Sequence, residues 1–411
     1  MATQIFTDVH LLVNTRTDNN LLRGHDLASL PCIENSYLII EDDMIAEFGR
    51  MEKFKYPADS IRVDENSMIL PCWCDSHTHL VFAGSRENEF VDKLNGLSYA
   101  DIAAKGGGIL NSAEKLNETS EDELFRQASK RISEVSKLGT GAIEIKSGYG
   151  LSLGGELKML RVIKRLKENS RIEIKSTFLG AHAFPADYKD DHRAYIDLLI
   201  NDLLPVIAKE KLADYIDVFC ENGFFSAEEM ETICLAGKSF GLKPKLHVNQ
   251  LNSIGGIEKG IELNAVSLDH LETLTEEEIQ ILGRFNGCST LLPTAAFFLR
   301  MQYQPARNLI ESGAAIALAS DYNPGSSPSG NMNFVVSLAC IQLKMLPEEA
   351  INAATVNGAY AMELEKDYGS ITVGKKANLI FTKPIPSLAY LPYSFGSNLI
   401  DRVMIKGEFI N

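Results

Sequence analysis

Residues 67–79 read Ser67-Met-Ile-Leu-Pro-Cys-Trp-Cys-Asp-Ser-His-Thr-His79, an apolar run that ends in two histidines two residues apart. In an extended segment, side chains at i and i+2 lie on the same face of the strand. His77 and His79 can therefore hold one metal ion at the end of this strand through neutral imidazole nitrogens. A His-x-His pair alone is a weak signal, because histidines also occur as structural core residues. The pair gains weight because later strand-like segments end in His247, His270 and Asp321.

Length and charge limit the class of protein. The 411 residues suffice for one large barrel domain and a smaller second domain, and 45% hydrophobic with 23% charged residues is typical of a globular protein. A net charge of −15 argues against nucleic acid or an anionic membrane surface as partner, because phosphates would be repelled. The sequence has no apolar window long enough to span a membrane and no secretory signal pattern. These features predict a cytoplasmic protein that binds neither nucleic acid nor membranes.

The cysteines also predict a cytoplasmic location. Seven are scattered along the chain, mostly in apolar surroundings, and the odd number favours reduced core residues in the cytoplasm. Cys72 and Cys74 precede His77 and could be mistaken for part of a metal motif. Since no second cysteine pair completes a zinc ribbon, we interpret both as core residues.

Both chain ends are rich in short strands. The β-type segments are 9–13, 36–40 and 44–48 near the start, and 378–381 and 402–405 near the end. This similar pattern of short strands at both ends predicts one small β-sandwich domain assembled from residues 1–66 and 367–411.

The middle of the chain, residues 67–366, alternates strands with amphipathic helices. Eight strand segments are expected: Met68–Leu70 running into Cys72–Asp75, then 142–146, 174–181, 215–220, 244–248, 265–270, 288–292 and 316–321. Helical stretches such as 122–138, 195–210 and 227–240 separate them. Eight strands with intervening helices predict an α/β fold, a (β/α)₈ TIM-like barrel.

Polar side chains gather where these strands end. They include Lys146, His182, Glu221, His247, His270 and Asp321. The C-terminal ends of barrel strands meet on one face, so these residues are expected to lie together. Three imidazoles and one carboxylate suit zinc or iron with a position left for water, whose pKa the ion lowers. Asp321 can accept the water's proton, and His270 can bond a developing oxyanion. A buried histidine bonded to the backbone remains the alternative for His270.

The order of these residues along the strands resembles the amidohydrolase superfamily, over nearly the whole chain. The resemblance implies the metal ligands His77, His79, His247 and Asp321. Two-metal members usually bridge their ions with a modified lysine on strand four, but that strand, residues 215–221, carries no lysine. We therefore expect one ion per chain. Glu221 is the only local candidate for a second bridge, and Lys146 is expected to form a structural ion pair.

Longer motifs between the ligands resemble the imidazolonepropionase family within that superfamily. They are 79–90, 106–109, 144–151, 177–182, 291–298 and 319–327. The resemblance implies hydrolysis of 4-imidazolone-5-propanoate to N-formimidoyl-L-glutamate by a homodimer. It also implies that the substrate pocket contains Arg86, Tyr149, His182, Asn323, Gly325 and Ser326.

The pocket residues suit this substrate, although each has a plainer interpretation. Arg86 can present a fork to the propionate, or it can be a solvated surface arginine. Tyr149 can lie against the ring, or it can be an ordinary loop tyrosine. The amides of residues 323–327 can hold an anion, or the segment can be a simple Pro-Gly turn. Gly106-Gly-Gly108 suggests a mobile loop near the pocket.

One position departs from the family pattern. The family usually has His-x-x-Glu after strand five, whereas this chain reads His247-Val-Asn-Gln250. Gln250 cannot shuttle protons near neutral pH, but its amide can hydrogen-bond the imidazolone ring. We therefore expect Asp321 and His270 to move the protons of catalysis and Gln250 to bind substrate.

Two other functions compete. An aminohydrolase on the same scaffold would deaminate a purine, pyrimidine or guanidine-like ring, and such enzymes commonly use the glutamate that is absent here. A scaffold protein without chemistry would usually have lost ligands, yet every expected ligand is present. The ligand set suits zinc and iron equally.

Overall fold

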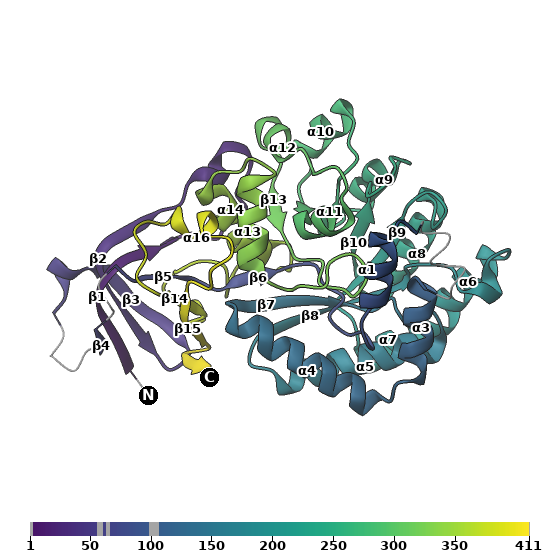
Figure 1. Ribbon diagram of the computed structural model, residues 1–411, viewed down its shortest axis with the longest axis horizontal. Coiled ribbons are helices and arrows are strands. Elements are labelled where there is room, and N and C mark those ends of the chain that lie inside the picture. The colour runs from purple at the N-terminus through teal and green to yellow at the C-terminus, as the bar shows by residue number, and fades with distance from the viewer. Residues whose placement is uncertain (1–2, 56–60, 63–65, 98–106, 411) are drawn as a thin grey trace.

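The computed structural model describes residues 3–55, 61–62, 66–97 and 107–410, and it contains a barrel beside a mixed sheet (Figure 1). The barrel is an eight-stranded parallel sheet in the order β13-β12-β11-β10-β9-β8-β7-β6. Its strands are β6 (Trp73–Asp75), β7 (Thr140–Lys146), β8 (Glu173–Ala181), β9 (Tyr215–Cys220), β10 (Lys243–Val248), β11 (Ser267–His270), β12 (Cys288–Leu291) and β13 (Ile316–Leu318).

The seam that closes the barrel lies just beyond β6 and β13. Thr78 and Tyr322 form a parallel bridge there. The Asp321 N–H donates to the His77 carbonyl at 3.0 Å, and the His79 N–H donates to the Tyr322 carbonyl at 3.0 Å. Closure of the barrel therefore brings the His-x-His pair beside Asp321, although more than two hundred residues separate them. The predicted barrel is confirmed.

Helices surround the barrel, and several begin at side-chain caps. Ser120 accepts from the Glu123 N–H at the start of α4, and Ser226 with Glu229 forms a capping box at α8. The outer helices are α4 (Glu121–Lys137), α5 (Leu153–Asn169), α6 (His192–Leu198), α7 (Leu204–Glu210), α8 (Ala227–Ser239), α9 (Gly256–Glu262), α10 (Glu276–Leu282), α12 (Ala306–Ser312), α13 (Met332–Ile341) and α14 (Pro347–Ala354). A π-helical segment, Leu199–Leu203, joins α6 to α7, so the helix expected at 195–210 is interrupted. Other helices are α1 (Glu87–Leu94), α3 (Ile109–Glu118), α11 (Pro293–Leu299), α15 (Val356–Tyr360) and α16 (Tyr390–Tyr393).

The mixed sheet joins both ends of the chain, as predicted, and lies at the left of Figure 1. Its strands are β1 (Thr3–Val13), β2 (Cys32–Glu41), β3 (Met44–Arg50), β4 (Ile61–Arg62), β5 (Met68–Pro71), β14 (Leu379–Thr382), β15 (Ile400–Ile405) and β16 (Glu408–Ile410). β5 pairs parallel with β1 and antiparallel with β14, so it links the two terminal segments. The core of this sheet is mostly aliphatic and includes Phe6 and Phe381, whose rings lie at a centroid distance of 5.1 Å.

The prediction that Met68–Leu70 begins the first barrel strand was wrong. These residues form β5 of the mixed sheet, and the barrel strand contains only Trp73–Asp75. The reason is that β5 is buried on both faces. Ile69 packs into the mixed-sheet core, while Met68 and Leu70 pack into the barrel core. A strand buried on both faces is a continuous apolar run, as a barrel strand is. The domain limits at residues 66 and 367 stay a prediction.

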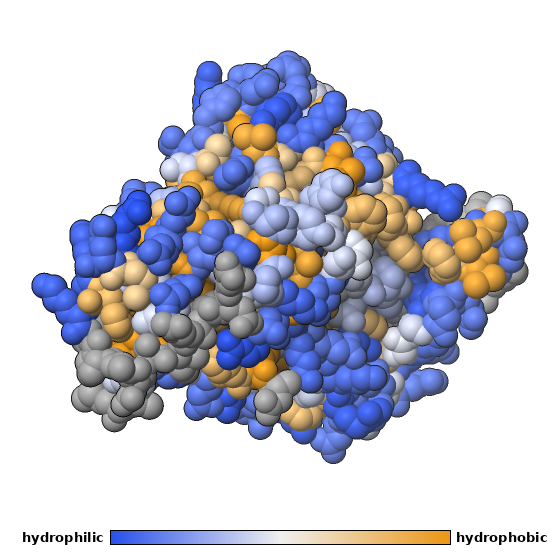
Figure 2. Space-filling view, turned by 60° about the vertical axis from the view of Figure 1, so that its left-hand side comes forward, coloured by the Kyte–Doolittle hydropathy of each residue, from blue (hydrophilic) through white to orange (hydrophobic). Residues whose placement is uncertain are grey.

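Charged and polar side chains cover most of the face in Figure 2, with apolar patches between them. Across the described part of the chain, no helix has the length and apolar character that a membrane span needs. All seven cysteines are free. Five of them are buried, Cys340 is partly buried and only Cys32 is exposed, so Cys32 does not fit the expected core position.

Candidate active site

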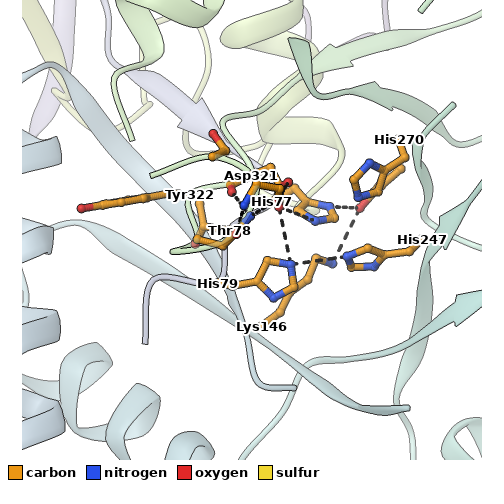
Figure 3. A network of polar contacts seen from close by, with 12 residues as sticks. His77, Thr78, His79, Lys146, His247, His270, Asp321 and Tyr322 are labelled. Carbon is orange, nitrogen blue, oxygen red and sulfur yellow. Dashed lines mark hydrogen bonds and ion pairs between the residues drawn. The ribbon is translucent and has the colours of Figure 1, made fainter. Parts of the chain in front are cut away.

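The four residues expected to bind a metal meet in one buried place. Asp321 Oδ1 lies 3.6 Å from both His77 Nε2 and His79 Nε2. His247 Nε2 lies 3.4 Å from His79 Nε2. Two sets have ligand atoms within 4.8 Å of one another, His77 with His79 and His247, and His77 with His270 and Asp321. Figure 3 shows these side chains turned toward a common centre.

Two carboxylates lie behind the imidazoles. His77 Nδ1 is 2.7 Å from Asp269 Oδ2, and His247 Nδ1 is 2.7 Å from Asp217 Oδ2. A carboxylate accepts, so each Nδ1 carries the proton and each Nε2 lone pair is free to bind an ion. His77 Nε2 is buried and makes no hydrogen bond within the described ranges. A buried nitrogen without a hydrogen-bond partner, facing a carboxylate and two imidazoles, fits a bound cation.

A fully buried lysine connects these carboxylates. Lys146 Nζ is 2.8 Å from Glu144, 2.9 Å from Asp217 and 3.6 Å from Asp269. Burial alone would lower the pKa of Lys146, but the three carboxylates raise it above the ordinary value. Lys146 therefore lies in a buried ion-pair network behind the imidazoles (Figure 3).

Sequence reasoning missed Asp217 and Asp269. The short strand of Asp269 also contains Ser267 and His270, whereas Asp217 gave a usable signal, because it is a charged residue within a strand that is otherwise apolar. Such residues need a buried partner.

The two residues expected to move protons are both buried and differ in their surroundings. Burial raises the pKa of Asp321 to about 6, against the opposing effects of His270 and the Ser326 hydroxyl. His270 Nδ1 lies 3.3 Å from Glu272 Oε1. Burial alone would lower the pKa of His270, but Glu272 and the nearby aspartates raise it. The ring is thus paired with a carboxylate rather than with the backbone. Both residues have positive φ, 52° for Asp321 and 87° for His270, which is strained backbone of the kind found at functional sites.

The turn after Asp321 is held by hydrogen bonds among its own residues. Ser326 Oγ donates to Asp321 Oδ2 at 3.0 Å. Asn323 Oδ1 accepts from the N–H groups of Gly325 and Ser326, both at 2.8 Å. These two amides already have an acceptor, which favours the plain turn over an anion nest.

Arg86 lies beside this turn and is largely buried, with 12% of its side chain exposed. Its Nε donates to Glu89 Oε2 at 2.8 Å, and its Nη2 donates to the same oxygen at 2.5 Å. A Cβ added at Gly325 would lie 2.3 Å from Arg86 Nη1, so only glycine leaves room for the guanidinium. The neighbouring pocket of about 460 Å³ is lined by Arg86, Phe82, Phe90, Phe298, Tyr322 and Pro324 among others.

Tyr149 and His182 lie against His79, one of the expected ligands. The His182 ring stacks on His79 with a centroid distance of 5.2 Å and an angle of 15°. Tyr149 meets His79 edge-on at 5.8 Å and His182 at 5.5 Å. Burial lowers the pKa of His182 to about 4, so the imidazole is neutral at physiological pH.

The Glu221 carboxylate, the candidate bridge to a second metal ion, accepts hydrogen bonds from the neighbouring loop. Its Oε2 accepts from the N–H groups of Leu251 and Asn252 at 2.8 and 3.1 Å, and its Oε1 accepts from Asn222 N–H and Asn252 Nδ2 at 2.8 and 2.9 Å. Glu221 therefore fixes the loop next to Gln250. Gln250 is partly buried, and its amide has no hydrogen-bond partner among the described residues.

A cleft of about 920 Å³ borders this loop. Its lining includes Glu221, Asn222, Phe184, Phe224, Gly107 and Gly108. Gly106, the first residue of the glycine run expected near the pocket, lies outside the described residues.

Metal-binding groups at the C-terminal ends of barrel strands define a class of metal-dependent barrel hydrolases. The model of the amidohydrolase family matches residues 68–410, and the chain belongs to this metal-dependent family.

Within it, the chain belongs to the imidazolonepropionases. It is 58% identical to the imidazolonepropionase of Flavobacterium johnsoniae over 411 residues, covering 100% of both chains. It is 55% identical to that of Christiangramia forsetii over 410 residues, covering 99% of this chain and 100% of the other. The resemblance stated from the motifs is confirmed.

Solved structures agree on the fold. E. coli guanine deaminase has a TM-score of 0.73 at 14% identity and covers 100% of this chain and 99% of its own. An adenosine deaminase from Xanthomonas campestris with bound zinc has a TM-score of 0.66 at 15% identity and covers 98% and 93%. Identities this low support the shared barrel architecture alone.

Proposed function

We propose that this chain hydrolyses the cyclic amide C–N bond of 4-imidazolone-5-propanoate and releases N-formimidoyl-L-glutamate, a step of histidine degradation. The observation that carries the proposal is the meeting of Asp321 with three imidazoles beside Arg86, in a chain 58% identical over its length to an imidazolonepropionase.

His77, His79, His247 and Asp321 would hold one zinc or iron ion per chain. Their nitrogens and carboxylate suit both metals. When bound, such an ion lowers the pKa of a water molecule and polarises a carbonyl group.

Asp321 acts as the proton carrier. Its carboxylate takes a proton from the attacking water as the new C–O bond forms at the ring carbonyl. It then gives this proton to the ring nitrogen as the C–N bond breaks, so no other reactant is needed.

His270 stabilises the oxygen of the ring carbonyl as negative charge develops there. The carboxylate of Glu272, 3.3 Å from His270 Nδ1, orients the ring and favours its charged form.

Arg86 binds the propionate. Its Nε and Nη2 are bonded to Glu89, so Nη1, the atom beside Gly325, is the donor available to the substrate. Tyr149, His182 and Gln250 contact the imidazolone ring, and Asn323, Gly325 and Ser326 form the wall beside Asp321. Gln250 contributes through its amide rather than as an acid or base.

The direct test supplies freshly prepared 4-imidazolone-5-propanoate and follows the loss of ring absorbance, with identification of the product. We expect N-formimidoylglutamate without ammonia. Turnover of Asp321→Asn should be lower by about 10²- to 10⁴-fold, the contribution that general acid–base catalysis typically makes. Ammonia release from a cyclic amidine would instead favour the rival aminohydrolase, and retained turnover in Asp321→Asn would refute the role of that carboxylate.

We further propose a cytoplasmic homodimer that binds neither nucleic acid nor membranes. The net charge of −15 and the seven free cysteines support this environment. Exposed apolar side chains on α1, Phe90, Val91 and Leu94, are 43–56% exposed and offer a surface for a second copy. Sedimentation equilibrium measures the mass directly.

A further inference from the structure

We propose that Glu156 is a positioning residue for the reaction, because its buried carboxylate fixes both the place of Tyr149 and the tautomer of His182. The inference rests on the proposed function, in which these two rings contact the substrate.

Glu156 holds the loop on both sides of Tyr149. It lies in the first turns of α5 and is fully buried. Its Oε1 accepts from the N–H groups of Gly150 and Leu151 at 2.7 and 3.1 Å. Its Oε2 accepts from the Gly148 N–H at 3.1 Å. One carboxylate therefore binds the residue before Tyr149 and the two residues after it.

The glycines of this loop permit the close contact. A Cβ added at Gly150 would lie 2.2 Å from the Glu156 backbone nitrogen, and one at Gly155 would lie 2.7 Å from the Gly150 Cα. Gly148 has a φ of 106°, a region open to glycine and strained for other residues. The loop is thus pressed directly onto the start of α5.

The same carboxylate reaches His182 through one residue. Gly148 donates its N–H to Glu156, and its carbonyl lies 2.9 Å from His182 Nδ1. A carbonyl oxygen only accepts, so Nδ1 carries the proton of the neutral ring. His182 Nε2 is left as an acceptor. If Gly148 moved away, His182 could adopt either tautomer.

A shift of this loop would also affect the expected metal ligands, because the rings of Tyr149 and His182 both lie against His79, at centroid distances of 5.8 and 5.2 Å. Displacement of reacting groups by about 1 Å can cost a hundredfold in rate. A purely structural carboxylate at the start of a helix would instead affect folding stability alone.

The test compares Glu156→Gln with Glu349→Gln. Glu349 is an apt control because it is also buried in the first turn of a helix, α14, where it accepts from the Leu346 N–H at 2.7 Å and from Arg307 at 2.6 Å. The wild type must first bind metal and hydrolyse imidazolonepropanoate; failure there refutes the proposed function, whatever Glu156 does. We expect Glu156→Gln to keep its metal and lose about a hundredfold in kcat/KM. Glu349→Gln should change kcat/KM less than twofold, and equal kinetic effects in the two variants would overturn the inference.

A double-mutant cycle and a spectrum complete the test. In a Tyr149→Ala, His182→Ala background, Glu156→Gln should cost less than threefold, because the groups it positions are gone. An undiminished hundredfold cost would contradict the proposal. Nitrogen-15 NMR of histidines in the zinc-loaded wild type should give protonated Nδ1 and bare Nε2 for His182, assigned with His182→Asn. The opposite tautomer would overturn the proposal even if Glu156→Gln fails to fold.

Discussion

Replacing Asp269 by asparagine removes the charge behind one expected metal ligand and keeps the side-chain shape. Asp269 Oδ2 lies 2.7 Å from His77 Nδ1, and both side chains are fully buried. An amide oxygen accepts more weakly than a carboxylate, so the His77 ring is held less firmly and its Nε2 becomes a weaker donor.

The expected loss is tenfold to a hundredfold in metal affinity, the range for carboxylate partners of ligating histidines. This equals about 1.4 to 2.7 kcal/mol. Asp217→Asn should cause a similar loss through His247. The two variants should differ in folding stability, because Lys146 Nζ lies 2.9 Å from Asp217 but 3.6 Å from Asp269. Asp217→Asn removes the closer of the two aspartates from Lys146, while Glu144 still pairs with it at 2.8 Å, so the cost should exceed that of Asp269→Asn but stay below about 3 kcal/mol, the cost of a fully broken buried pair.

The assay is a competition titration of the metal against a chromophoric chelator, with denaturant unfolding of the metal-free protein alongside. Asp214→Asn is the matched control. Asp214 is a partly buried aspartate that accepts from the Ser176 N–H at 2.9 Å, but it pairs with Lys167 and is 30% exposed. Its metal affinity should equal that of the wild type. A folded Asp269→Asn variant with unchanged affinity would refute the reasoning.

Three further results are expected. Gly325→Ala places a Cβ 2.3 Å from Arg86 Nη1 and should raise KM about tenfold with metal content unchanged. An unchanged KM would show that Arg86 does not bind the propionate. Glu221→Gln weakens the hydrogen bonds from the Leu251 and Asn252 N–H groups and should lower kcat/KM while the metal content stays at that of the wild type. Loss of a metal ion in this variant would show that Glu221 is a metal ligand. Burial lowers the pKa of Lys375 to about 8, so between pH 8 and the ordinary lysine value this residue binds a proton in the unfolded chain but not in the folded one, and its contribution to the free energy of unfolding should rise with pH there. Lys375→Met should remove that rise, and a parallel pH profile for both proteins in denaturant titrations would contradict it.

The sequence predicted the barrel and the gathering of His77, His79, His247 and Asp321, because each of these residues lies at or just after the end of an apolar strand and a parallel barrel brings such ends together. It could not place β5, since burial on both faces gives the same apolar run as a barrel strand. The helix expected at 195–210 is interrupted by a π-helical segment just before Pro205, which lacks a backbone N–H and clashes with the preceding turn, so the sequence did contain a signal for this break.

Within the site, the sequence predicted residue types better than their hydrogen bonds. Glu221 was a candidate metal bridge by position, but its oxygens are used by the backbone of the neighbouring loop. The amides of Gly325 and Ser326 looked free for an anion, but the Asn323 side chain accepts from both. Such contacts depend on the loop path, which strand and helix periodicity does not determine.

Elemental analysis of purified protein tests the central claim most directly. The account predicts one zinc or iron ion per wild-type chain and almost none in folded His77→Ala and His247→Ala. His182→Ala should keep its ion, because that ring stacks on His79 without belonging to the expected ligand set. A full complement of metal in the His77 and His247 variants would contradict the account.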